Sequence, residues 1–340
     1  MSRILILSDV ENHCFSNRAN AIKKHAPPDL EFDVVHYDSQ DIGTIVWDQY
    51  DLVFCLPTNV GLNIRKLWNC QPHIRTVPLV VSHNSGLGRR HAVLLEAILG
   101  ADYVIVNNYA MWAACQPFAR PGIYNAINIS NGVDRDIFHP RDGFNALRAD
   151  RRQHDSPNTI CRVIWTATES KAADPQDVKG YQGTLQHLKT MLDNMGHGWE
   201  PDFPIINAHN ALTPDKMAEW YSGAEILVCA SRSEGTPNIL LEAMACGCVP
   251  VTTAVGNVTE LVQHKQNGDI VSQNNLDGFH RGLEYVREHW PRMSKAALES
   301  MDGWGWSDRA VCFYRLFRRI IAGETIEPYT YLNEPNGAED

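Results

Sequence analysis

The chain has 340 residues, of which 44% are hydrophobic and 21% are charged, and this length accommodates two domains with buried cores. The formal net charge of -10 excludes a general nucleic-acid coat protein, although a local basic strip is compatible with a phosphate-bearing partner. Nine cysteines without CxxC pairs or zinc-type His/Cys spacing exclude a disulfide scaffold, and they favour reduced, mostly buried thiols in a cytosolic protein.

The first residues, MSRILILSDVENH, contain only a short aliphatic run before polar residues return. This run is too short for a signal peptide or a transmembrane helix, so we expect a cytoplasmic protein. At the other end, residues 323–340 are mostly polar, and we expect a loosely attached tail.

Short aliphatic or β-branched runs alternate with segments of helical period, a pattern typical of parallel sheets with helices on both faces. In the first half the strand candidates are Arg3–Ser8, Phe32–Tyr37, Leu52–Leu56, Leu79–Ser82 and Tyr103–Asn107. Helical segments such as Asn17–Lys24 and Arg90–Leu99 lie between them, and Gly100 is placed to end the second of these. Residues 1–140 are therefore predicted to form a Rossmann-like domain.

Residues 141–158 are highly charged and lack periodicity, which is typical of an interdomain linker. The alternation restarts after them, and residues 159–305 are predicted to form a second Rossmann-like domain. Its strand candidates are Cys161–Thr166, Pro204–Ala208, Ile226–Ala230 and Val249–Thr253. Residues 306–322 then form an amphipathic helix that we expect to pack back on the first domain. Because ligands bind beyond the carboxyl ends of strands in such sheets, we expect the site residues just after strands.

One segment, residues 226–251, combines a buried strand, a polar loop, a helix and a further strand in the sequence ILVCASRSEGTPNILLEAMACGCVPV. Thr236 has the properties of an N-cap, and Pro237 suits the first helical position because its missing N–H has no partner there. The N–H groups at this helix start would attract a diphosphate through oriented donors and the helix dipole.

Glu234 lies in the loop before this helix and Glu242 lies within the helix, with seven residues between them. Such a pair can also be two surface carboxylates without a function, one in a loop and one on the solvent-facing side of a helix. The surrounding loop, helix start, glycine stop and strand order favour a functional interpretation instead. One carboxylate can then reach a transferred sugar while the other reaches further along the donor.

This stretch resembles the retaining glycosyltransferases of family four, whose hallmark is two glutamates with seven residues between them. The resemblance extends from about Ile129 to Val271 and includes NGVDRDIFHP at 131–140 and AVGNVTELVQHKQNGDIV at 254–271. It implies the GT-B fold, in which two Rossmann-like α/β domains face each other across a cleft. It also implies that residues 1–140 bind the acceptor and residues 159–305 bind a nucleotide-sugar donor.

The resemblance assigns roles to residues of the second domain. Glu242 is expected to bind the ribose hydroxyls of the donor, and Glu234 to contact sugar hydroxyls near the reacting carbon. The residues that follow Glu234 are expected to hold the sugar and the diphosphate: Gly235, Thr236, Pro237 and Asn238. The nucleotide base is expected near residues 208–210, which include His209.

Two further positions match the family. Lys179, in DVKGYQG, is expected to neutralise the departing diphosphate, and a solvated surface lysine is the alternative. His83 ends the strand PLVVSH, and it is expected to contact the sugar and organise the reacting geometry. A structural histidine at a strand end is the alternative for His83.

The chain departs from the family after the first strand of the second domain, where a Gly-Arg pair usually supplies a second cation. The sequence there reads VIWTATESKAADPQDVKGY. Thr166, Ala167 or Thr168 stands where the arginine would be. Thr168 is expected to bind the donor, and Lys171 is a candidate substitute for the cation. The phosphate site or the donor preference is therefore expected to be unusual.

The first loop also lacks the paired glycines common in the family. Asn12, His13, Ser16 and Asn17 are candidates for contacts with the acceptor or the sugar, and capping of the next helix is the alternative, above all for Ser16. The sequence Asp134-Arg135-Asp136 has the spacing of a metal-binding DxD, but it lies in the family's stretch at the end of the first domain, so we interpret it as structural. No metal and no cofactor are expected.

The predicted function is a metal-independent retaining glycosyltransferase that moves a sugar from a UDP- or GDP-type donor to an acceptor hydroxyl by front-face attack. A sugar-nucleotide epimerase and a catalytically altered GT-B protein that serves as a nucleotide-sugar-binding scaffold are the alternatives. A Rossmann dehydrogenase is disfavoured because no glycine fingerprint follows the first strand. The sequence does not decide whether the acceptor is a saccharide, a lipid, a small metabolite, a protein or modified nucleic acid.

Overall fold

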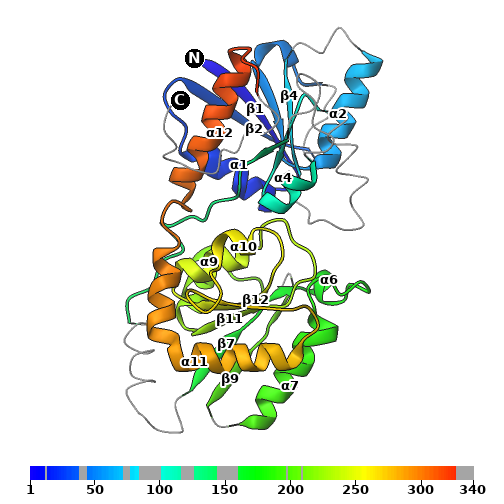
Figure 1. The fold of residues 1–340 in the computed structure, drawn as a ribbon. Helices are drawn as coiled ribbons and strands as arrows, with labels where there is room; N and C mark the ends of the chain where they lie inside the picture. Colours follow the sequence, from blue (N-terminus) through cyan, green and yellow to red (C-terminus); the bar gives the residue numbers. More distant parts are fainter. Residues whose placement is uncertain are drawn as a thin grey trace. The chain divides into compact units, whose positions relative to one another are not determined.

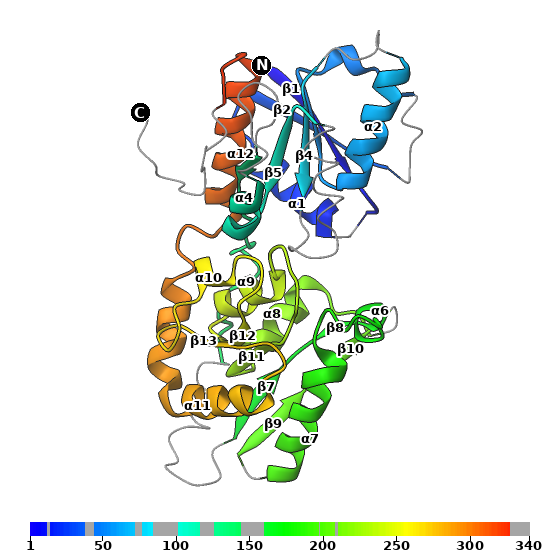
Figure 2. The ribbon, with the colours of Figure 1, turned by 45° about the vertical axis from the view of Figure 1, so that its right-hand side comes forward.

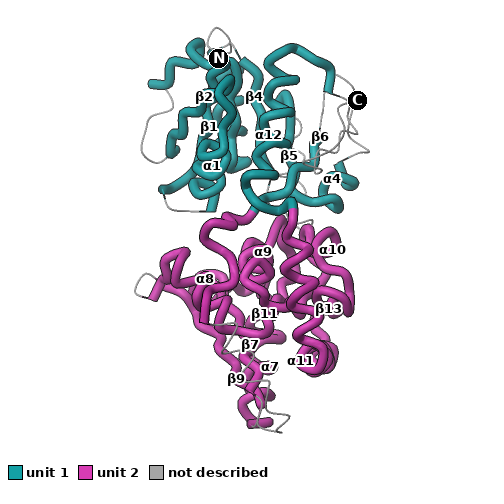
Figure 3. Tube along the Cα trace, turned by 90° about the vertical axis from the view of Figure 1, so that its left-hand side faces the viewer, with its two compact units in different colours: residues 1–132, 303–340 teal, residues 133–302 magenta. Residues whose placement is uncertain are grey.

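The computed structural model describes residues 1–11, 14–37, 44–71, 77–83, 101–115, 126–143, 160–196, 198–207 and 210–326. The chain divides into two compact units, residues 1–132 with 303–340 and residues 133–302 (Figure 3). Each unit has its own parallel sheet and its own buried core. Within the described ranges, every helix is too short or too polar to cross a membrane.

The first unit is built on a six-stranded parallel sheet with the order β2-β1-β3-β4-β5-β6 (Figure 1). Helices cover both faces of this sheet, so its strands are almost continuous aliphatic runs. Its elements are β1 Ser2–Ser8, α1 Cys14–Lys24, β2 Leu30–His36, η2 Trp47–Gln49, β3 Leu52–Cys55, α2 Thr58–Cys70, β4 Leu79–His83, β5 Tyr103–Val106, α4 Tyr109–Cys115, β6 Ala126–Asn128 and α12 Trp306–Ile321.

The helix α12 completes this core from the far end of the chain, and Figures 1 and 2 show it alongside the sheet. Phe313 and Phe317 pack on Phe54 of β3, with ring centroids 5.8 and 5.3 Å apart. The hydroxyl of Tyr314 donates a hydrogen bond to the carbonyl of Ile22 in the neighbouring helix α1. The predicted amphipathic helix is therefore present, and its apolar stripe is a core surface of the first unit.

The second unit has a five-stranded parallel sheet with the order β13-β12-β11-β7-β9 and a separate parallel pair, β10-β8. Its elements are β7 Cys161–Ile164, β8 Ala167–Thr168, α6 Glu169–Ala172, η5 Tyr181–Leu185, α7 Gln186–Met195, β9 Trp199–Asp202, β10 Ile205–Ile206, α8 Pro214–Ser222, β11 Ile226–Cys229, α9 Asn238–Ala245, β12 Val249–Thr253, α10 Val258–Leu261, β13 Asp269–Val271 and α11 Leu276–Glu299.

The five strands predicted in the first half are present as β1 to β5 with slightly shifted bounds, whereas the short strand β6 was not predicted. In the second half, the predicted strand Pro204–Ala208 is wrong in extent and in place. Among its described residues, Ile205–Ile206 form a strand, and this strand pairs with β8 rather than with the main sheet. The edge of the main sheet is formed by Trp199–Asp202, whose Pro201 and acidic residues are tolerated at an edge. The predicted helix Arg90–Leu99 lies outside the described residues.

The division between the units falls earlier than the predicted boundary at residue 140. Arg135 donates from Nη1 to the carbonyl of Met301 at 3.0 Å, and Arg141 forms an ion pair of 2.9 Å with Asp215. The backbone N–H of Arg141 also donates to the hydroxyl of Ser222 at 3.2 Å. These contacts attach residues 133–141 to the second unit. Most of the predicted linker, from residue 144 to 158, lies outside the described residues.

Phe317→Ala tests the contribution of α12 to the first unit. The substitution removes a fully buried ring from the contacts with Phe54 and Phe313, so we expect the free energy of unfolding to fall by about 3–5 kcal/mol. Thermal and urea unfolding would measure the loss. Ser307→Ala, at an exposed position of the same helix, is the control and is expected to change stability by less than about 0.5 kcal/mol. Equal effects of the two substitutions would contradict the packing role of α12.

Candidate functional site

The candidate site in the second unit follows from the pairing of β7 with β11. These strands are parallel neighbours, so the loops at their carboxyl ends emerge at the same edge of the sheet. The two loops touch through their backbones, because the N–H of Arg232 donates to the carbonyl of Val178 at 2.7 Å. Gly180, with a φ of +67°, lies so close to Ala230 that a Cβ atom would stand 2.2 Å from the Ala230 carbonyl oxygen.

Lys179 and Glu234 meet where these loops touch. The Nζ atom of Lys179 forms an ion pair and hydrogen bond with Oε1 of Glu234, and the two side chains are 22% and 14% exposed. The hydroxyl of Ser231 donates to the same carboxylate oxygen at 2.8 Å. Burial lowers the pKa of Lys179, but the charge and the hydrogen bond of Glu234 outweigh it, so the pKa is raised. Lys179 is therefore a cation at neutral pH.

The helix that follows Glu234 begins one residue later than predicted. Pro237 is the N-cap, with extended backbone and no side-chain capping bond, and α9 begins at Asn238. The prediction of Thr236 as N-cap and Pro237 as the first helical residue is therefore wrong. The N–H of Leu240 bonds back to the carbonyl of Pro237 at 2.9 Å, which closes the first turn. The first helical N–H groups are those of Asn238 and Ile239, which follow Glu234 by four and five residues in the sequence.

Glu242 lies on α9 and is held by α8. The hydroxyl of Tyr221 donates to Oε2 of Glu242 at 2.9 Å. Burial raises the pKa of Glu242 to about 7, and the hydrogen bond from Tyr221 acts in the opposite direction. Burial also raises the pKa of Tyr221 well above its ordinary range, so Tyr221 remains a donor. Near neutral pH, Glu242 therefore exchanges between a carboxylate and a neutral acid.

His83 lies in the first unit at the carboxyl end of β4 and is 2% exposed. Its Nδ1 atom is 3.1 Å from the hydroxyl of Thr58, and that hydroxyl donates its proton to the carbonyl of Ser82 at 3.0 Å. The hydroxyl of Thr58 is thus within hydrogen-bond distance of both the Ser82 carbonyl and the His83 ring, and the direction of its bond to Nδ1 depends on the histidine tautomer. This arrangement orients the imidazole ring at the strand end.

The other predicted positions in the first unit are spread along α1 or lie outside the described residues. Ser16 is buried inside α1, which begins at Cys14, so the interpretation of Ser16 as a helix cap is wrong. Asn17 is exposed on the same helix. Asn12 and His13 lie outside the described residues, so no contact is assigned to either.

In the second unit, Thr168 is exposed at the N-terminus of α6, where its hydroxyl is 3.3 Å from the hydroxyl of Ser170. Lys171 is also exposed and lies in the last turn of the same short helix. His209 lies outside the described residues. Its neighbour Asn210 accepts from the N–H of Asn207 at 2.6 Å and donates to the carbonyl of Ile205 at 2.8 Å.

The DxD-like stretch forms a local turn. Asp134 accepts from the N–H of Asp136 at 3.0 Å, while Arg135 contacts Met301. These contacts agree with a structural interpretation. In the part of the chain that the structure describes, no three His, Cys, Asp or Glu side chains are grouped in a way that would hold a metal ion.

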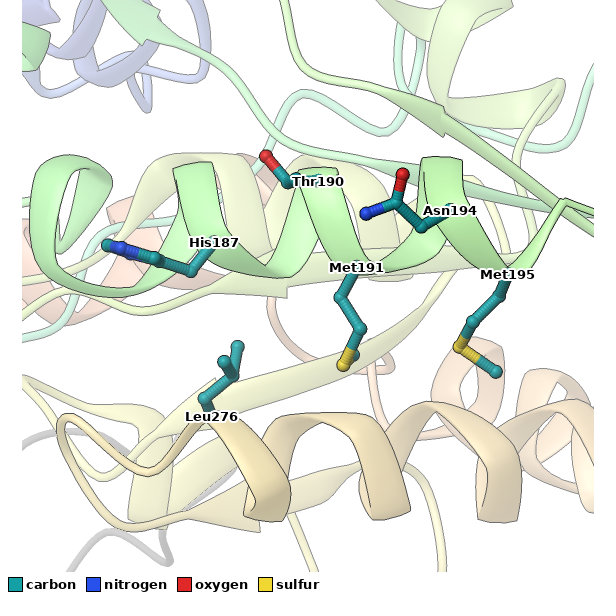
Figure 4. A pocket seen from close by; sticks show the side chains of 6 residues that line it. All are labelled: His187, Thr190, Met191, Asn194, Met195 and Leu276. Atoms are coloured by element: carbon teal, nitrogen blue, oxygen red, sulfur yellow. The ribbon is translucent and has the colours of Figure 1, made fainter.

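A pocket of about 470 Å³ lies elsewhere in the second unit, between α7 and the start of α11 (Figure 4). Met191, Met195 and Leu276 project into the space between the two helices, and the polar lining residues are His187, Thr190 and Asn194. None of the predicted site residues lines this pocket, so we assign it no part in the candidate site.

Several residues at the site were not predicted from the sequence. Tyr221 lies within the stretch that resembles the family, but no role was predicted for it, and its contact with Glu242 shows its place. Ser231 and Arg232 stand in SRSEG beside a glutamate that was predicted, so their nearness in sequence was an available signal. Asp177, which contacts Arg232 at 3.2 Å, stands two residues before Lys179 in DVKGYQG and had the same signal.

Residues 183–289 match a family model described as "Glycosyl transferases group 1". A D-inositol 3-phosphate glycosyltransferase of Kribbella flavida is 32% identical over 117 residues, which cover 32% of this chain and 27% of that relative. A D-inositol 3-phosphate glycosyltransferase of Mycobacteroides abscessus is 29% identical over 209 residues, which cover 56% of this chain and 46% of that relative. The matched part thus spans less than half the length of these curated relatives.

Two solved structures resemble nearly the whole chain at low identity. Sucrose-phosphate synthase from Thermosynechococcus elongatus is 14% identical with a TM-score of 0.66, and the match covers 95% of this chain and 100% of that one. Anabaena Alr3699/HepE in complex with UDP-glucose is 15% identical with a TM-score of 0.65 and the same coverage. These likenesses show the fold, and the GT-B class of α/β fold expected from the sequence is confirmed. The cleft between the units stays a prediction.

Glu242→Gln tests the protonation of Glu242. The pKa rises from an ordinary 4.5 to about 7 in the folded chain, so between these pH values the folded state binds a proton that the unfolded state does not bind. The free energy of unfolding of the parent chain therefore falls as pH rises through this window and levels off above pH 7, by at most on the order of 3 kcal/mol. Thermal unfolding from pH 4.5 to 8.5 is the measurement.

The glutamine variant lacks this proton, so its stability relative to the parent chain is expected to rise between pH 4.5 and 7. Glu219→Gln, at an exposed carboxylate of the neighbouring helix α8, is the matched control. Parallel stability curves for the parent chain and Glu242→Gln would contradict the burial of an ionisable Glu242.

Proposed function

We propose that this chain is a retaining glycosyltransferase of family four that transfers a sugar from a nucleoside diphosphate donor to an acceptor hydroxyl. The observation that carries this proposal is the partly buried ion pair of Lys179 and Glu234 beside the start of α9, with Glu242 further along the same helix. Withdrawing charged groups from water costs free energy, and charged pairs with a perturbed pKa are found preferentially at functional sites. The match of residues 183–289 to a glycosyltransferase family model supports the same conclusion.

The chemistry follows from the charges at these loops. A departing nucleoside diphosphate gains negative charge, and a cationic Lys179 with the first N–H groups of α9 stabilises that charge. Glu234 then accepts hydrogen bonds from sugar hydroxyls near the reacting carbon, and Glu242 from the ribose. The amide and hydroxyl groups of residues 235–238 complete the donor site. In this proposal the reaction needs no metal ion, because protein groups neutralise the diphosphate.

Retention of configuration is proposed to follow a front-face route. The acceptor hydroxyl attacks on the face from which the diphosphate leaves, with an oxocarbenium-like sugar between them. Glu234 is bound to Lys179 and Ser231, which suits a role in binding and orienting hydroxyls better than a role as a covalent nucleophile. His83, whose ring is oriented by Thr58, is proposed to contact the sugar from the first unit.

The names of similar proteins indicate which ligands to test first. Anabaena Alr3699/HepE has been solved with UDP-glucose, so UDP-glucose heads the set of donors. The curated relatives are named for D-inositol 3-phosphate, which puts phosphorylated polyols among the small-metabolite acceptors to be screened. We propose that the donor binds in the second unit and the acceptor in the first, and that the protein acts in the cytoplasm.

Donor binding is the first experiment. We expect one of UDP, GDP, ADP, CDP or their common sugar conjugates to raise the Tm of the parent chain, because a ligand that binds only the folded state stabilises it. Glu242→Ala removes the proposed ribose contact and should abolish the shift. A thermal-shift screen at fixed ligand concentration makes the comparison. Binding without turnover over any acceptor would favour the scaffold alternative, and no shift with any ligand would contradict the proposed donor site.

Lys179→Met tests leaving-group stabilisation once a donor and an acceptor are found. The substitution keeps much of the side-chain volume but removes the charge, so we expect kcat to fall on the order of 10²–10³-fold. Lys189→Met, on an exposed side chain of α7, should leave kcat unchanged. Proton NMR of the product gives the anomeric configuration, and inversion of that configuration would overturn the retaining mechanism.

A further inference from the structure

We propose that Arg232 is a positioning residue that acts together with Asp177 and Asn274. It holds the segment that carries Lys179 against the loop that carries Glu234. The inference rests on the proposed function, because it assigns Arg232 the task of keeping Lys179 in place for the donor diphosphate. It also concerns the part of the chain that departs from the family, between β7 and Lys179.

Arg232 connects loops that follow three different strands. Its Nη2 atom donates to Oδ2 of Asp177 at 3.2 Å and to Oδ1 of Asn274 at 3.0 Å. Its carbonyl accepts from Nε2 of Gln273 at 3.0 Å, and its N–H donates to the carbonyl of Val178. Asp177 lies in the connection after β7, beyond β8 and α6, whereas Arg232 follows β11 and Asn274 follows β13. One side chain therefore fixes the spacing of three loops at one edge of the sheet.

Asp177 transmits this contact to the segment on both sides of Lys179. Its side chain is 9% exposed, and its two carboxylate oxygens accept from the N–H of Gln182 at 2.9 Å and of Gly183 at 2.8 Å. Those N–H groups belong to the first turn after Lys179. The carboxylate therefore ties Arg232 to the backbone just before and just after the lysine.

The backbone of residues 177–180 is strained and depends on contacts that stabilise it. Asp177 has a φ of +46° and Gly180 a φ of +67°, so a left-handed residue lies on each side of the pair Val178-Lys179. A non-glycine residue in that region costs about 1 kcal/mol, which the surrounding contacts must offset. Glycine at position 183 leaves room for the contact between Arg232 and Asp177, because a Cβ atom there would stand 2.9 Å from Nη2 of Arg232 and 3.0 Å from Oδ2 of Asp177.

Loss of Arg232 removes the cation that faces a largely buried carboxylate. Asp177 would keep its two N–H donors but lose its only charged partner among the described residues. The segment 177–183 would then open more often, and Lys179 would spend less time beside Glu234. Lysine at position 232 keeps the charge, but its flexible ammonium lacks the fixed geometry with which Nη2 of the rigid guanidinium bonds both Asp177 and Asn274, so we expect only partial rescue.

Amide hydrogen exchange tests the positioning without any ligand. In Arg232→Ala, peptides that cover residues 177–185 are expected to exchange at least about tenfold faster, while peptides of α9 and α11 keep their rates. Arg232→Lys should lie between that variant and the parent chain. Lys189→Ala, which removes an exposed ion pair on α7, is the matched control. Unchanged exchange at 177–185 in Arg232→Ala would overturn the inference whatever the chain's activity.

A double-mutant cycle tests the link to Lys179. The ligand is the nucleoside diphosphate that stabilises the parent chain, and its affinity is measured by isothermal titration calorimetry. We expect Arg232→Ala to lower this affinity by about tenfold in the parent chain and to have no further effect in a Lys179→Ala background. Additive losses in the double variant would overturn the inference and indicate a separate role for Arg232. If Arg232→Ala does not fold, Arg232→Lys and Asp177→Asn carry the same cycle. Failure of the parent chain to bind any nucleotide would instead count against the proposed function and leave the exchange result standing.

Discussion

The parallel pairing of β7 with β11 is the constraint on which the candidate site depends. Ile226 pairs with Val163 and Leu227 with Ile164, and this register brings the loops after both strands to one edge of the sheet. Lys179 and Glu234 are 55 residues apart in the sequence and meet only because of that register. A partly buried cation and a partly buried carboxylate each lose hydration, so each is stabilised by the partner that the strand register brings to it.

The same edge of the second unit concentrates polar contacts in a largely apolar setting. Ser231 and Tyr221 each donate to one of the two glutamates, and the main-chain contact between Gly180 and Ala230 leaves no room for a side chain. The two glutamates differ in surroundings. Glu234 faces a cation, whereas Glu242 faces a neutral hydroxyl and its pKa is raised by burial. One sequence pattern thus produces two carboxyl groups in chemically different surroundings, which suits the two different binding tasks proposed for them.

The region of family similarity and the region of departure meet at this site. The family model covers residues 183–289, which include both glutamates and begin just after Lys179. The segment before it contains α6 in place of the family's Gly-Arg pair, and it reaches the glutamate loop through Asp177 and Arg232. The proposed donor site therefore combines residues inside the matched stretch with residues before it, and we expect the residues before it to influence donor preference.

The sequence by itself determined the elements and the motif. The alternation of aliphatic runs with helical segments predicted parallel α/β units, the spacing of Glu234 and Glu242 identified the loop and helix of the site, and the apolar stripe of residues 306–322 predicted α12. These features are local, because period and composition are decided by neighbours along the chain. Short strands and strands of atypical composition were not predicted, such as β6 and the edge strand Trp199–Asp202.

Only the tertiary structure decided the partners. The bonds from Lys179 to Glu234, from Tyr221 to Glu242 and from Arg232 to Asp177 join residues from different elements. The start of α9 at Asn238 and the division after residue 132 were likewise set by contacts rather than by local pattern. The physical reason is the same in each case. A side chain's partner depends on strand order and register, and these follow from the packing of the whole unit, which no local pattern contains.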